Sequence, residues 1–167
     1  MWTELREDID QARKQMNIGE QDFCAVPINQ WEEIQRNIYT KFCNLGPNSK
    51  VTWFWNFFKL DQYAVAFDNN WPFDQLVNLI EPSEKVWLFL NESASEGEKF
   101  WFYEGTIKPI ALILGESRYT DEVYIASKKY EWLICVNHHD EIIATGKDMP
   151  EKLKQVEDEI KKEKPKN

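Results

Sequence analysis

The segment at residues 122–146, EVYIASKKYEWLICVNHHDEIIATG, constrains the fold more than any other part of the chain. It contains three apolar runs of strand length, and polar residues that favour turns separate them. At residues 130–136 both sets of alternate positions are mostly apolar, so both faces of this strand should be covered. We therefore expect three antiparallel strands, of which the middle one lies in the interior of a sheet.

The polar turn at residues 137–140 holds the only two histidines of the chain. Two imidazoles beside a carboxylate could ligate a metal or act as an acid and a base. Adjacent residues of an extended chain point in opposite directions, whereas two ligands of one metal need a spacing of two on a strand or four on a helix. We therefore expect no metal and no catalytic residue here. His138, His139 and Asp140 are predicted to contact a partner or to bond backbone groups.

The rest of the chain alternates between helical and extended patterns. Helices are predicted at residues 3–16, 29–46, 71–82, 105–115 and 148–160, with Asn29 as the N-cap of the second. Strands are predicted at residues 63–67, 85–91 and 100–103, and residues 17–27 form a loop. Residues 51–58 fit a strand or a helix, and we favour a short helix.

These elements predict a single α+β domain over residues 1–167. Its sheet is mainly antiparallel, with five or six strands and packed helices. The helix at residues 3–16 has a thin apolar stripe and should be peripheral. The lysine-rich tail at residues 161–167 should be solvated.

Negative charge is concentrated in the body of the chain. The net charge is −9, and residues 147–167 carry seven lysines and six acids, so residues 1–146 carry −10. Such a body would repel a nucleic-acid backbone and attract a basic protein. Glu92, Glu96 and Glu98 crowd one loop, and we expect them to take part in partner binding.

Several classes of protein are disfavoured by what the sequence contains. Three cysteines, Cys24, Cys43 and Cys135, lie far apart without a CxxC pair, and the N-terminus is charged, so we expect reduced thiols in the cytoplasm. No apolar run approaches the roughly 20 residues of a membrane helix. Six scattered glycines give no phosphate-binding loop, so no nucleotide cofactor is expected.

Aromatic side chains are abundant, with eight tryptophans in 167 residues. Most of them must contribute to the core, because aromatic side chains bury large apolar areas. Tryptophan is also enriched among the residues that anchor protein interfaces. One or two tryptophans left exposed would therefore mark a binding surface.

The segments EKVWLFLNES, KFWFYEGTI and YIASKKYEWLICVNHHDEIIATG are similar to those of the YxiI-like family of small bacterial proteins, over residues 84–146. Such proteins resemble the immunity partners of secreted polymorphic toxins. Those partners are small acidic cytoplasmic domains that bind a toxin domain and protect the producing cell. The resemblance implies a protein partner and assigns no catalytic residue.

We therefore expect a non-catalytic protein-binding domain, an immunity protein or antitoxin that masks a basic toxin surface. One alternative is a small hydrolase or nuclease that uses His138 or His139 with an acid such as Glu104 or Asp140. Another is a phage or host protein that inhibits a different protein machine. Both binding functions depend on the same surface chemistry and differ in their target.

Overall fold

The computed structural model describes residues 3–46, 48–67, 72–92, 99–117 and 120–163. Within these ranges, seven strands form one sheet in the order β1-β4-β3-β5-β6-β7-β2, and all of their pairings are antiparallel. The strands are β1 (Phe23–Ala25), β2 (Gln62–Ala66), β3 (Lys85–Glu92), β4 (Phe100–Thr106), β5 (Thr120–Ser127), β6 (Trp132–Val136) and β7 (Glu141–Gly146). The α+β class and the antiparallel sheet are confirmed, but the sheet has seven strands rather than five or six.

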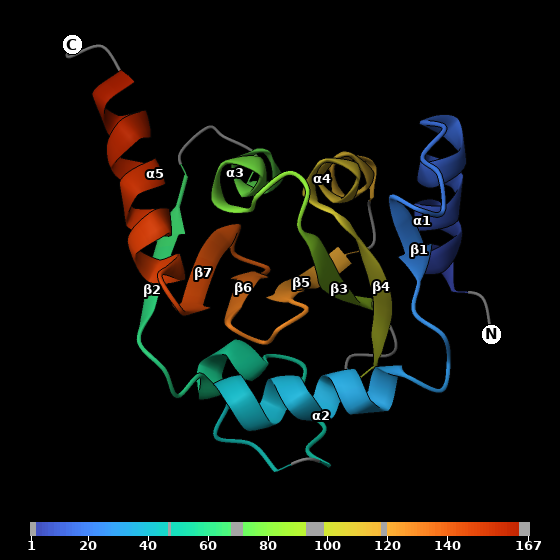
Figure 1. Ribbon diagram of the computed structural model, residues 1–167, viewed down its shortest axis with the longest axis horizontal. Helices are drawn as coiled ribbons and strands as arrows, with labels where there is room; N and C mark the ends of the chain where they lie inside the picture. Colours follow the sequence, from blue (N-terminus) through green and yellow to red (C-terminus); the bar gives the residue numbers. More distant parts are fainter. Residues whose placement is uncertain (1–2, 47, 68–71, 93–98, 118–119, 164–167) are drawn as a thin grey trace.

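Helices cover both faces of the sheet (Figure 1). The helices are α1 (Glu4–Gln15), α2 (Trp31–Phe42), the 3-10 helix η1 (Phe54–Phe57), α3 (Pro72–Leu79), α4 (Ile107–Glu116) and α5 (Met149–Glu163). Helices α3 and α4 lie over one face, and α2 with η1 lies across the other. No helix in the described part of the chain has the length and apolar character needed to cross a bilayer.

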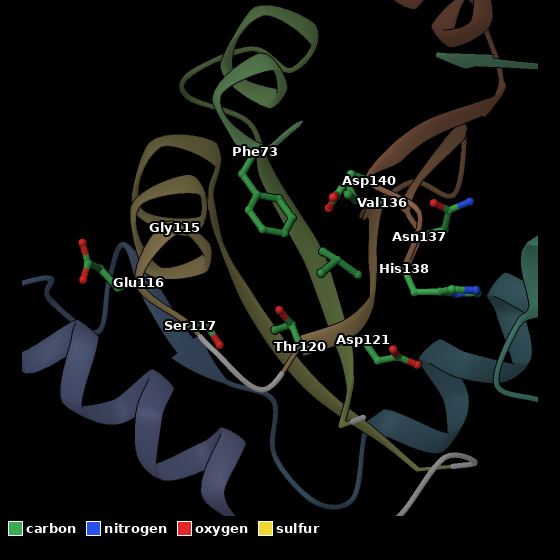
Figure 2. Close-up of a pocket in the computed structure, with 11 residues that line it drawn as sticks. Phe73, Gly115, Glu116, Ser117, Thr120, Asp121, Val136, Asn137, His138 and Asp140 are labelled. Carbon is green, nitrogen blue, oxygen red and sulfur yellow. The ribbon is translucent and has the colours of Figure 1, made fainter. Parts of the chain in front are cut away.

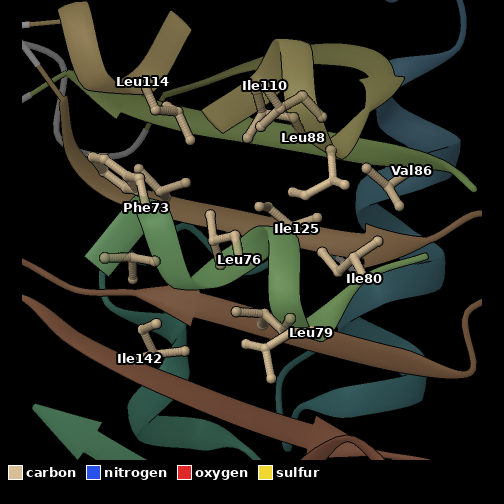
Figure 3. Packing of buried hydrophobic residues seen from close by; sticks show 14 of the residues in the cluster. Phe73, Leu76, Leu79, Ile80, Val86, Leu88, Ile110, Leu114, Ile125 and Ile142 are labelled. Atoms are coloured by element: carbon tan, nitrogen blue, oxygen red, sulfur yellow. The ribbon is translucent and has the colours of Figure 1, made fainter. Parts of the chain in front are cut away.

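The face beneath α3 and α4 has an aliphatic core. Figure 3 shows Leu76 and Leu79 of α3, and Ile80 directly after it, directed at the sheet, where Leu88 and Ile125 lie. All five side chains are almost completely buried. Helices α1 and α5 contribute to the same cluster from either side, so four helices share this apolar layer.

The opposite face has an aromatic core centred on η1. Phe54 is fully buried, and its ring stacks on Tyr124 with centroids 3.6 Å apart and on Phe89 at 5.7 Å. Phe100 and Tyr39 meet the same ring edge-on at 5.6 and 5.3 Å. Mixed stacked and edge-on contacts are favourable for aromatic rings, so the Phe54 side chain packs η1 closely against the sheet.

The strand missing from the prediction is β1, which lies within the segment expected to be a loop. It has three residues, too few to show an alternating pattern. It pairs with β4 where Phe23 lies opposite Gly105. A Cβ at position 105 would lie 2.7 Å from the backbone oxygen of Asp22, so the glycine permits this close approach.

Two predicted helix starts also differ from the structure. Helix α2 has Gln30, not Asn29, as its N-cap, and no side chain caps it. The amide of Gln30 donates to the carbonyl of Pro27, so a turn places Asn29 before the cap position. Strand β4 continues through Thr106 before α4 begins, because Gly105 is paired on both sides. The short helix expected within residues 51–58 is confirmed as η1.

Candidate functional site

The turn between β6 and β7 is held by the side chain of Asn137, which is 2% exposed. Its Oδ1 accepts hydrogen bonds from the amides of His139 and Glu141, both at 3.0 Å, and its Nδ2 donates to the Glu141 carboxylate. Asp140 has a φ of 59° and donates its amide to the Asn137 carbonyl. Because asparagine and aspartate favour such local bonds, this sequence gives a fixed turn.

A buried carboxylate lies under this turn. Glu122 of β5 is fully buried, and its Oε1 lies 2.5 Å from Nδ1 of His138. The backbone amide of His138 also donates to this oxygen at 3.5 Å, and the Cys135 thiol lies 3.7 Å from Oε2. Burial raises the pKa of Glu122, and the hydrogen bonds from His138 partly oppose that rise. His138 is therefore oriented by a carboxyl group that is not exposed to solvent.

The thiol beside Glu122 is not an activated nucleophile. Cys135 is fully buried, and burial raises its pKa well above the usual value. A reactive cysteine needs a lowered pKa and access to solvent, and this residue has neither. Cys135 therefore acts as a small apolar residue in the aromatic core, as its place in the middle of a strand predicts.

Replacing Glu122 with glutamine should change how stability depends on pH. Because burial raises the folded pKa of Glu122 above 4.5, its stabilising contribution is complete below the unfolded pKa and is lost as the pH rises through the folded pKa. Glutamine stays neutral, so the free energy of unfolding of Glu122→Gln should rise relative to that of the wild type as the pH increases from 4.5. The rise should be roughly 1.4 kcal/mol for each pH unit by which the folded pKa of Glu122 exceeds the unfolded one. Thermal unfolding of both proteins from acid to neutral pH measures this difference.

The matched control for this prediction is Glu159→Gln, which removes an exposed carboxyl group on α5. Its difference in melting temperature from the wild type should stay constant over the same pH range. A constant difference for Glu122→Gln as well would show that the buried carboxyl group has an ordinary pKa.

On the outer side of the turn, three rings form a surface that we call the aromatic patch: Trp53, His138 and His139. The ring of His138 lies 5.5 Å from that of Trp53 and 4.0 Å from that of His139. Trp53 is 50% exposed, although it immediately precedes η1, whose first residue is fully buried. The half-exposed ring of Trp53 thus contacts the imidazole of His138, which is itself hydrogen-bonded to Glu122.

A pocket of about 620 Å³ opens on the inner side of the turn (Figure 2). It lies where the end of α4, the start of α3, the start of β5 and the β6–β7 turn meet. Its lining residues are Phe73, Gly115, Glu116, Ser117, Thr120, Asp121, Val123, Val136, Asn137, His138 and Asp140. In Figure 2 the Asp140 carboxylate points towards Phe73, whereas the imidazole of His138 points away from it. The ring of His138 is therefore directed away from the apolar wall at Phe73, although His138 is one of the lining residues.

The sequence of residues 1–157 matches the family of unknown function DUF6756. The chain belongs to this family. No significant match was found among curated proteins or solved structures. The DUF6756 match spans all seven strands, the aromatic patch and the lining of the pocket. Membership of DUF6756 assigns no activity, so a function for the chain must be argued from the site itself.

In this member of DUF6756, the predicted site residues are only partly described. His138, His139 and Asp140 lie together in the turn, and all three are exposed. Glu92 is the last residue of β3, and its side chain is outside the described part. Glu96 and Glu98 lie outside the described residues altogether.

Glu104, which the sequence suggested as a possible acid partner of His138 or His139, pairs with lysines instead. The Glu104 carboxylate lies 2.7 Å from the ammonium group of Lys128 and 3.7 Å from that of Lys85. The structure instead places Glu122 beside His138, at a distance of sixteen residues in sequence. Among the described residues, no group of three or more histidine, cysteine or acidic side chains is arranged to hold a metal ion.

Proposed function

We propose that this protein is a non-catalytic binding domain that captures a basic protein through the aromatic patch and the acidic surface around it. The exposed Trp53, whose ring packs at a tilt against His138, is the observation that carries this proposal. Residues 84–146 are similar to the YxiI-like family, whose members resemble the immunity partners of polymorphic toxins, and this similarity favours a toxin domain as the partner. Binding would then block the toxin without any chemical reaction in the complex.

The aromatic patch has the properties of an interface anchor. Tryptophan is among the residues that contribute most to binding when they are buried by a partner. Rigid side chains lose little conformational entropy on association. In the free protein the ring of Trp53 already packs against His138, and His138 is hydrogen-bonded to Glu122. A partner that covers Trp53 therefore gains apolar burial at a small entropic cost.

The charge of the body supports a basic partner. Residues 1–146 carry −10, and the acids Asp121 and Asp140 lie at the same end of the sheet as the aromatic patch. Complementary charge accelerates encounter and disfavours partners of the wrong sign. We expect the association rate to fall as salt is added, because exposed charges are screened within about 10 Å at 0.1 M ionic strength.

Replacing Trp53 with alanine should weaken binding to the proposed toxin partner, first sought in the product of the adjacent gene, by roughly 30-fold or more, as expected for an interface anchor. Calorimetry or surface plasmon resonance measures the affinity, and survival of cells expressing the toxin measures protection. Leu112→Ala is the matched control, because Leu112 is 56% exposed on α4 and lies outside the aromatic patch. It should change neither quantity.

Two results would contradict the proposal. The first is a purified protein that fails to bind the product of the adjacent gene, together with a deletion strain that is no more sensitive to that product. The second is a folded Trp53→Ala variant that binds and protects like the wild type, which would move the interface elsewhere.

An acid–base site is a second candidate, and the Glu122–His138 pair favours it. A carboxylate that fixes one ring nitrogen of a histidine is the arrangement used to orient a catalytic base. The direction of the ring, which points away from the apolar wall at Phe73, counts against it. His138→Gln separates the two functions: a binding role predicts parallel losses of affinity and protection, whereas catalysis predicts lost protection at unchanged affinity.

A further inference from the structure

The pocket on the inner side of the β6–β7 turn shares His138 with the aromatic patch, but its other lining residues lie outside the patch and remain unexplained by it. Its volume of about 620 Å³ exceeds that of one side chain, and the wall formed by Phe73, Val123 and Val136 is apolar. This wall would suit the methylene groups of a long side chain. The polar groups of the pocket indicate which chemical group the end of that side chain carries.

Ser117 is the first of these polar groups. It is 9% exposed, and its Oγ has no hydrogen-bond partner among the described residues. Buried hydroxyl groups are normally bonded, so an unpaired one in the wall of a pocket indicates a missing polar partner. A hydroxyl oxygen can accept a hydrogen bond from a bound N–H group.

The second polar feature is negative charge. Glu116, Asp121 and Asp140 line the pocket, and none of the described lining residues is a lysine or an arginine. In Figure 2, Asp140 lies across the pocket from Ser117 and Thr120, and its carboxylate points inward. A cation placed between these groups would meet a carboxylate on one side and hydroxyl oxygens on the other.

We infer that this pocket receives a lysine or arginine side chain of the protein partner. The stem would pack on Phe73, Val123 and Val136, and the charged end would pair with Asp140 and bond the Ser117 hydroxyl. Charge-assisted hydrogen bonds of this kind are stronger and more directional than neutral ones. The inference rests on the proposed function for its partner, but the pocket chemistry can be tested without that partner.

The test uses Nα-acetyl-L-arginine amide as the probe and its neutral analogue Nα-acetyl-L-citrulline amide as the control ligand. We expect the arginine probe to give saturable NMR shifts at the amides of Ser117, Thr120 and Asn137 in the full-length protein. The citrulline analogue should give none at equal concentration. Equal shifts with both ligands, or no saturable shifts with either, would overturn the inference.

Two variants locate the binding. Asp140→Asn should weaken the arginine probe at least fivefold while keeping the turn, because asparagine tolerates the positive φ at this position. Ser117→Ala should weaken it about threefold, the loss expected for one hydrogen bond of modest strength. Asp158→Asn removes an exposed acid of α5 and should leave the affinity unchanged. An unchanged affinity in Asp140→Asn would exclude the pocket as the site.

The outcome of this test is distinct from that of the proposed function. Probe binding that depends on Asp140 would support the pocket even if the product of the adjacent gene proved not to be the partner. If Trp53→Ala lost binding to the partner and the wild type bound no arginine probe, the aromatic patch would be supported as the interface. The inference about the pocket would then be wrong. If both hold, Asp140→Asn should also weaken the toxin complex at least fivefold.

Discussion

Replacing Phe54 with alanine should lower the free energy of unfolding by roughly 3–5 kcal/mol, near the upper end for a single buried side chain. Phe54 is 0% exposed and is the ring on which Tyr124 and Phe89 stack. Its removal leaves a cavity between η1 and the sheet and also removes these aromatic contacts. Urea unfolding followed by tryptophan fluorescence measures the change.

Phe57→Ala is the matched control for this prediction. Phe57 ends the same 3-10 helix, but it is 40% exposed. Its truncation removes the same atoms from a site that solvent already reaches, so the loss should be about 1 kcal/mol or less. If both variants lost the same amount, η1 would not be fixed to the sheet through Phe54.

The second large effect is expected from Gly146→Ala. Gly146 ends β7 with a φ of 87°, and a Cβ there would lie 2.5 Å from the backbone oxygen of Glu131 and 2.9 Å from the Cα of Trp132. A side chain in this conformation is strained, and the neighbouring atoms are backbone that cannot move aside. We expect a loss of roughly 3 kcal/mol in the free energy of unfolding, measured by the same urea titration.

Gly115→Ala supplies the comparison for that substitution. Gly115 lies within α4, and a Cβ there meets no atom within 4 Å. Alanine favours helix over glycine by up to about 1 kcal/mol, so this variant should be slightly more stable than the wild type. Destabilisation of both variants to the same extent would show that neither clash nor strain at position 146 explains the loss.

The C-terminal sheet could be predicted because its information is local. Within residues 122–146 the apolar runs and turn residues follow one another directly, and β5, β6 and β7 pair in chain order. Strand β1 could not be predicted, since three residues carry no periodic signal and its partner is β4. Its existence depends on Gly105, a position whose role only the paired structure reveals.

The turn at the candidate site could be predicted because its residues are adjacent in sequence, whereas its distant contacts could not. The turn with His138, His139 and Asp140 is contiguous in sequence, so turn-forming residues located it. Glu122 and Trp53 reach it from other elements, and no spacing rule links them to the histidines. The sequence shows Glu122 only as an acid near the start of an apolar strand, and Trp53 only as one of several neighbouring aromatic residues. Both patterns are also typical of ordinary surface and core positions.

The positions of β1 and β2 at the two edges of the sheet have a consequence for synthesis on the ribosome. Phe23 pairs with Gly105 and Val65 with Ile142, so each edge strand waits for a partner made about 80 residues later. The N-terminal segment therefore leaves the ribosome well before the sheet it joins. Until β4 has emerged, β1 has no strand to pair with, and β2 has none until β7, the last strand, is complete.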